Sequence, residues 1–203
     1  MTVRLASSAL LPVVLAASLT AGASAQNGAK ALFHGPAGST ANPYGPVGIH
    51  YWFENDQGAR FTQARDAGVG ARLRLHIRSN TGGFLTAWMT DGSNEGIQLT
   101  ATKGQWTGHQ MEARRDYVVP GEIVVPAAGR ATRLLILFAR AQMEQVGTAA
   151  GAREKIRRLS LAIARDGGLA MVQEMDTSTP GQVGTYVVHR DGAQPGVEVE
   201  LQR

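Results

Sequence analysis

The clearest hydrophobic and polar pattern in the chain covers residues 72–78. Side chains there alternate between the apolar Leu73, Leu75 and Ile77 and the polar Arg72, Arg74, His76 and Arg78. Side chains two residues apart share one face of a strand, so this segment predicts a strand with one packed face and one face in water. Ile49–Phe53 alternates in the same way, with His50 and Trp52 opposite its other three side chains.

Further short segments rich in strand-forming residues are separated by turn sequences such as Ser79–Gly83. They are Phe84–Met89, Ile97–Ala101, Tyr117–Val119, Ile123–Val125, Arg133–Phe138, Leu169–Met175, Gly184–His189 and Val197–Leu201. Arg133–Phe138 is apolar on both faces, which predicts a central strand that is buried on both sides.

One segment has helical periodicity instead. Within Ala152–Arg165, the side chains of Ile156, Leu159 and Ile163 fall on one helical face, and two glycines follow the segment. Short strands at regular spacing, with one helix among them, predict a mostly β fold. We expect an Ig-like antiparallel β-sandwich with a short helix, Ala152–Arg165, before the closing strands.

The first 25 residues have the order of a secretory signal peptide. Arg4 precedes the apolar run Leu5–Leu19, which leads into the small-residue motif Ala23-Ser24-Ala25. The alternative is a retained anchor, but a span needs about 20 apolar residues and this run is shorter. We therefore predict an exported, periplasmic or secreted protein, cleaved after residue 25.

Residues 26–47 are rich in small and polar side chains and predict a flexible N-terminal segment, although Leu32 and Phe33 can dock on the domain. Residues 48–203 have the length of a single domain. No later stretch is apolar and long enough to span a membrane.

Composition excludes several kinds of site and binding partner. The chain has no cysteine, so disulfides, thiolate zinc sites and cysteine-linked lipid anchors are excluded. The formal net charge is +4 and falls to +3 without Arg4, with the basic residues scattered along the chain. That pattern does not indicate nucleic-acid binding and is compatible with a mild attraction to anionic envelope polymers.

The motifs of common enzyme classes are absent from the sequence. It contains no Gly-x-Ser-x-Gly nucleophile elbow, no His-Glu-x-x-His zinc motif and no phosphate-binding glycine loop. We therefore expect a protein that is not an enzyme and has no cofactor. The alternative is a hydrolase, because catalytic sites are defined by geometry rather than by sequence spacing.

Two segments suggest metal ligands. His50 and His76 lie on the polar faces of neighbouring predicted strands and, with Glu54, have the chemistry of a metal site. The Asp91–Glu95 turn resembles part of a calcium loop but lacks the full twelve-residue pattern. Exposed strand residues beside arginines and an acidic hairpin turn explain the two segments without a metal.

Three tryptophans, Trp52, Trp88 and Trp106, are candidates for an aromatic binding platform. Trp52 lies opposite the apolar face of its strand and shares the predicted polar surface with Arg74. We therefore predict that Trp52, Arg74 and Trp88 contact a partner.

Several segments together resemble the bacterial domain of unknown function 4384 family. They are Gly48–Glu54, Ala71–Asn80, Gly82–Leu85, Ala113–Pro120, Thr132–Arg140, Gly184–His189 and Val197–Leu201. The likeness covers most of residues 48–201. It implies an extracytoplasmic β-sandwich module and supplies no catalytic residues.

The sequence favours an exported, non-enzymatic module that binds a protein or a glycan of the bacterial cell envelope. A hydrolase acting on envelope polymers and a structural subunit of a secreted assembly are the alternatives. The pattern does not identify the partner or the oligomeric state.

The predicted signal peptide fixes the first residue of the exported protein. When the full chain is expressed in a Gram-negative host, the periplasmic product should begin at Gln26, as measured by intact mass spectrometry. Ala25→Arg puts a large charged residue at the cleavage motif and should leave the precursor uncut. A periplasmic product that retains residues 1–25 would contradict the prediction.

Overall fold

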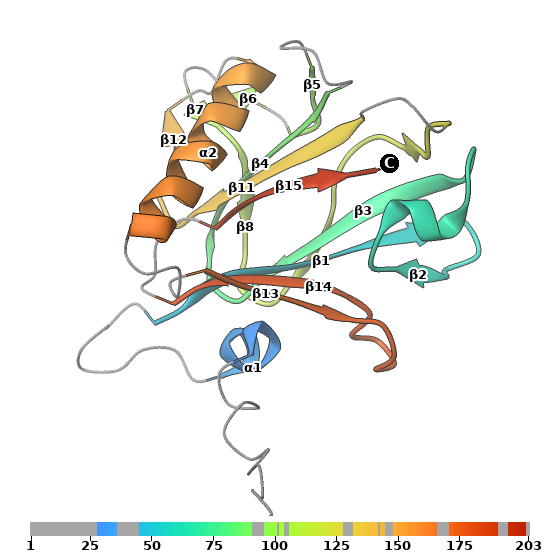
Figure 1. Cartoon of the computed structure of the whole chain (residues 1–203), viewed down its shortest axis with the longest axis horizontal. Helices are drawn as coiled ribbons and strands as arrows, with labels where there is room; N and C mark the ends of the chain where they lie inside the picture. The colour runs from blue at the N-terminus through green and yellow to red at the C-terminus, as the bar shows by residue number, and fades with distance from the viewer. Residues whose placement is uncertain are drawn as a thin grey trace, which may run out of the picture.

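Two antiparallel β-sheets pack face to face in the structure, a computed structural model (Figure 1). It describes residues 28–35, 45–90, 96–100, 102–103, 106–127, 132–141, 143–144, 148–165, 171–190 and 195–201. This arrangement confirms the predicted mostly β sandwich. The predicted signal peptide and the Asp91–Glu95 turn lie outside the described residues.

The first sheet, called sheet I, has the strand order β10-β3-β1-β14-β13, with β2 beside β1 and β9 beside β3. Its strands are β1 (Val47–Asn55), β2 (Arg60–Phe61), β3 (Arg72–Ser79), β9 (Asp116–Val118), β10 (Ile123–Val124), β13 (Met171–Asp176) and β14 (Gly184–His189). β9 and β10 both pair with β3. They are separate strands because Pro120, between them, has no backbone N–H to continue the ladder.

The second sheet, called sheet II, has the order β15-β11-β4-β5, with β8 beside β4. Its strands are β4 (Gly83–Thr90), β5 (Ile97–Gln98), β8 (His109–Met111), β11 (Arg133–Ala139) and β15 (Gly196–Glu200). A small third sheet joins β6 (Thr102–Lys103), β7 (Trp106–Thr107) and β12 (Met143–Glu144). The long strands agree with the predicted segments, whereas β2, β6, β7, β8 and β12 were not predicted.

The main core lies between the two sheets and is built by the predicted alternation. Leu73, Leu75 and Ile77 point inward from β3 and are at most 1% exposed. They belong to one hydrophobic cluster with Leu134 and Ile136 of β11. Full burial of one such side chain contributes about 1.5–3 kcal/mol to folding stability. One face of each long strand therefore packs in this core.

The outer face of sheet II is covered by α2 (Ala149–Arg165), which begins three residues before the predicted helix (Figure 1). Ala152 and Ile156 of α2 pack on Leu135 and Leu137 of β11. β11 is therefore buried on both faces, as its sequence predicts.

A second helix, α1 (Ala29–His34), lies within the segment predicted to be flexible and covers part of the outer face of sheet I. Phe33 is 2% exposed and packs with Tyr186 and Val188, and Leu32 packs at the edge of this group. The expected docking of Leu32 and Phe33 is confirmed. A six-residue helix is unstable alone, so tertiary packing must stabilise it, and local sequence did not predict it.

Polar contacts hold the start of α1 in place. The backbone N–H of Lys30 donates to Glu174 at 3.0 Å, and the Lys30 ammonium forms an ion pair with Asp176. Burial raises the pKa of Asp176, but hydrogen bonds from Lys30 and Thr179 outweigh it and hold the pKa below its usual range.

Docking of α1 predicts the effect of removing its main apolar contact. Phe33→Ala should lower the free energy of unfolding by about 3 kcal/mol, because a buried aromatic side chain is lost and a cavity remains. Urea unfolding measures the change, with the exposed Ala31→Ser as the control that should stay within about 0.5 kcal/mol of wild type. An unchanged Phe33→Ala midpoint would show that α1 does not pack in solution.

Candidate functional site

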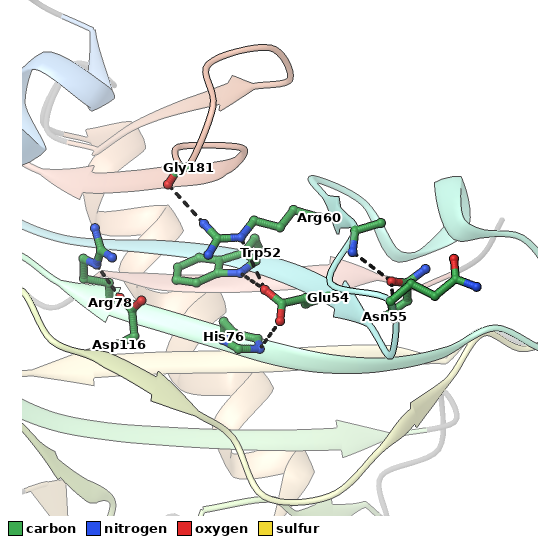
Figure 2. A network of polar contacts seen from close by, with 10 residues as sticks. Trp52, Glu54, Asn55, Arg60, His76, Arg78, Asp116 and Gly181 are labelled. Carbon is green, nitrogen blue, oxygen red and sulfur yellow. Dashed lines mark hydrogen bonds and ion pairs between the residues drawn. The ribbon is translucent and has the colours of Figure 1, made fainter.

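The candidate site is the part of the outer face of sheet I formed by β1, β2, β3 and β9 (Figure 2). Directly opposite side chains on neighbouring strands lie close enough to interact. The pairing register creates three such pairs, Trp52–His76, Glu54–Arg60 and Arg78–Asp116. We call these six residues the outer-face cluster.

Glu54 is the centre of the polar contacts in this cluster. Its carboxylate accepts hydrogen bonds from Arg60 Nε at 3.3 Å and from Trp52 Nε1 at 3.5 Å, and lies 3.8 Å from His76 Nε2. Arg60 also donates to the carbonyl oxygen of Gly181 at 3.1 Å. Burial lowers the pKa of His76 despite the nearby Glu54 charge, so His76 is neutral at pH 7.

Trp52 lies beneath the arginines of the cluster. Its side chain is 0% exposed although it points away from the main core, so the indole itself does not form an open platform in the structure. The guanidinium of Arg60 lies 4.7 Å from the indole centroid and that of Arg78 lies 5.9 Å away. Long arginine side chains can cover an apolar ring while their charged ends stay near water.

Arg74 is exposed as predicted, and it lies on the same face of β3 as His76 and Arg78 of the outer-face cluster. Its side chain is 60% exposed and pairs with Asp56 at 3.1 Å. Arg72 and Arg78, on either side, pair with Glu122 and Asp116. The arginines of this face thus each have a carboxylate neighbour, and the face presents paired charges rather than a single-sign patch.

Trp88 lies far from this face. It is 5% exposed and packs with Leu135 and Ile156 beneath α2, on the outer side of sheet II. The structure therefore does not bring Trp88 to Trp52 and Arg74. The side chain of Trp106 lies outside the described residues.

His50 continues the row of rings that starts at His76 and Trp52. It stacks on Tyr186 with centroids 4.1 Å apart, 5.0 Å from Trp52, and is 2% exposed. Burial, aided by the charge of Arg78, lowers the pKa of His50 to about 4. Gly184 lies so close that any Cβ there would collide with the imidazole. His50 is therefore a neutral, enclosed ring at pH 7.

His50 and His76, the two histidines weighed above as metal ligands, are not neighbours in the structure. His50 lies opposite Arg78, whereas His76 lies opposite Trp52, so the indole separates the two imidazoles. Within the described part of the chain, no three His, Cys, Asp or Glu side chains gather as a metal site. The Asp91–Glu95 turn is outside that part.

Sequence reasoning missed the residues that cover the site. Asp116 and Tyr186 come from segments that are distant along the chain from β1, and Arg60 comes from β2, which follows β1 directly. A signal was present, because the outward residues of β1 begin with His50 and Trp52 rather than with charged side chains. Large rings on both faces of a strand indicate that both faces are covered.

No family model, curated protein or solved structure matches this chain. The resemblance stated from its sequence segments therefore stays a prediction.

The enclosure of His50 predicts a pH dependence of stability. Its pKa is about 4 in the fold and 6.5 when unfolded, so the unfolded chain binds the extra proton between these values. Stability should fall as pH decreases from 6.5 to 4, by about 3 kcal/mol from this residue. His50→Phe keeps a buried ring and should remove that part of the slope in urea unfolding measured across this range.

His109→Phe is the control, because His109 is only half-buried. It should flatten the slope less than His50→Phe does. Equal slopes in wild type and His50→Phe would show that His50 is protonated normally in the fold.

Proposed function

We propose that the mature chain is a non-enzymatic binding module of the bacterial cell envelope, and that its partner is a protein or an envelope glycan. The observation that carries this proposal is the incomplete cover of sheet I. α2 covers the outer face of sheet II, and α1 covers the end of sheet I near Tyr186. Around Trp52 and Arg74, only side chains cover the sheet in the part of the chain that the structure describes.

The exposed arginines can exchange a carboxylate of this chain for a carboxylate of a bound molecule. Surface ion pairs such as Arg74–Asp56 and Arg72–Glu122 contribute only about 0–1 kcal/mol each. A carboxylate on a partner can therefore replace the internal one at little cost. Arginine is also enriched among the residues that dominate binding energies. Trp52 supports this surface from below, by holding Arg60 in place.

Export and family resemblance support the same proposal. The pattern of residues 1–25 predicts a signal peptide, and with it export from the cytoplasm. The resemblance to the domain of unknown function 4384 family implies an extracytoplasmic module. The described helices include none that is both apolar enough and long enough to cross a bilayer.

A hydrolase acting on envelope polymers is the second candidate. A cavity of about 410 Å³ near β8 and β9 is lined by His109, Glu112 and Asp116, among others. The His109 ring stacks on Tyr117, which also lines this cavity, with ring centroids 3.7 Å apart. Release of soluble fragments from purified envelope polymers would favour this candidate.

The binding proposal predicts that reversing the charge of Arg74 weakens binding. The mature wild-type chain should retain either solubilised envelope proteins or purified peptidoglycan, and Arg74→Glu should weaken retention at least tenfold. Arg158→Glu is the matched control, because Arg158 is also an exposed, ion-paired arginine but lies on α2. Quantitative affinity capture with the three proteins measures the difference.

Two results would contradict the proposal. One is retention of neither material by the wild-type chain. The other is equal loss in Arg74→Glu and Arg158→Glu, which would indicate a non-specific charge effect.

A further inference from the structure

Sheet I extends beyond sheet II on one side of the sandwich. β13 is the last strand of sheet I on that side, and β15 is the last strand of sheet II. Gln173 and Met175 lie on the inward side of β13, because they pair with the buried inward residues Val187 and Thr185 of β14. Yet Gln173 is exposed and Met175 is 52% exposed. Sheet II therefore stops one strand short of covering β13.

β15 presents its backbone toward this uncovered strip. It pairs only with β11 among the described strands. Phe138 donates to the carbonyl of Pro195 and Leu201 donates to Thr132, which directs the backbone groups of odd-numbered residues toward β11. The N–H and C=O groups of Gly196 and Glu198 consequently point away from β11, to the other edge of β15.

A cleft of about 590 Å³ lies where these two features meet. Its lining residues come from both free edges and from the segment after β2, and they include Met175, Gln173, Val199, Glu198, Gln63 and Arg65. Strands in a sheet are about 4.8 Å apart and packed sheets about 10 Å apart. A strand added beside β15 would therefore lie directly over the inward side of β13.

We infer that this cleft binds an extended peptide segment of a protein partner, which adds as a strand to the free edge of β15. Main-chain hydrogen bonds to Gly196 and Glu198 supply the pairing, and alternate side chains of the peptide cover Met175 and Val199. The inference shares with the proposed function the premise that the chain binds partners, but it concerns a different surface.

Charge and ring exposure favour a peptide with an acidic residue over a glycan. The two carboxylates of the cleft are both close to arginines: Glu198 lies 2.9 Å from Arg133 and 3.6 Å from Arg153, and Glu200 lies 3.5 Å from Arg133. They therefore do not repel such a peptide strongly. Arg65 is exposed and forms no ion pair with the described residues, which leaves it available to a carboxylate. Sugars stack on exposed rings, and Tyr51, the aromatic residue of this cleft, is only 3% exposed.

Proline at position 198 tests the inference. It removes the central N–H of the free edge without removing a hydrogen bond to β11, since the N–H of Glu198 points away from that strand. Glu198→Ala removes the same ion pairs and keeps the N–H, so the comparison of the two variants isolates main-chain pairing. Circular dichroism and urea unfolding check that both variants fold.

The probe is a phage-displayed library of random nine-residue peptides, selected on the mature wild-type chain. Selected peptides should alternate apolar residues and carry Asp or Glu near one end. Synthetic copies should bind wild type and Glu198→Ala within about threefold, and Glu198→Pro at least tenfold more weakly. Arg65→Gln should weaken the acidic peptides and leave their neutral versions unchanged.

Several results would overturn the inference. They are failure to select any peptide, equal binding by Glu198→Pro and Glu198→Ala, and binding of peptidoglycan fragments in place of peptides. Dimerisation of wild type that Glu198→Pro abolishes would assign the edge to a second copy of the chain and overturn the peptide partner. Arg74 does not line this cleft. The affinity capture with Arg74→Glu therefore tests the proposed function independently of the peptide-binding measurements.

Discussion

The burial of β1 and β11 on both faces is the constraint on which the rest of this structure depends. Each is flanked by paired strands in its sheet, and each faces the opposite sheet across the main core. With no cysteine available for disulfides, apolar burial has to stabilise the fold. Their outward residues, such as Trp52 and Leu135, also need cover. A helix covers one of them and charged side chains cover the other.

The two kinds of cover have different consequences. α2 seals Leu135 and Trp88 with a regular element, and that face is closed. Trp52 is sealed by Arg60 and Arg78, whose charged ends stay near water. A helix is held in place by many contacts at once, whereas a single side chain moves alone. The cover over Trp52 can therefore rearrange with less loss of packing than α2 can.

Alternation along the sequence was sufficient to predict the long strands and the core. It succeeded for β3 because Leu73, Leu75 and Ile77 need only a local period of two to be recognised. It failed for Trp52 and His50 because their cover comes from Arg60 and Phe33, which lie outside the strand. Local pattern does not contain such pairings. It also missed α1, whose six residues are helical only through docking.

The unequal width of the two sheets could not be predicted from pattern either, and it follows from the same constraint. β13 has Val172 and Glu174 on its outward side against α1, so α1 and β14 help to hold it in sheet I. Its inward side is then free to carry Gln173 and Met175 in contact with water. A fully apolar inward side would have required another strand in sheet II. The amide of Gln173 and the thioether of Met175 can be exposed to water, and both can also pack against another group.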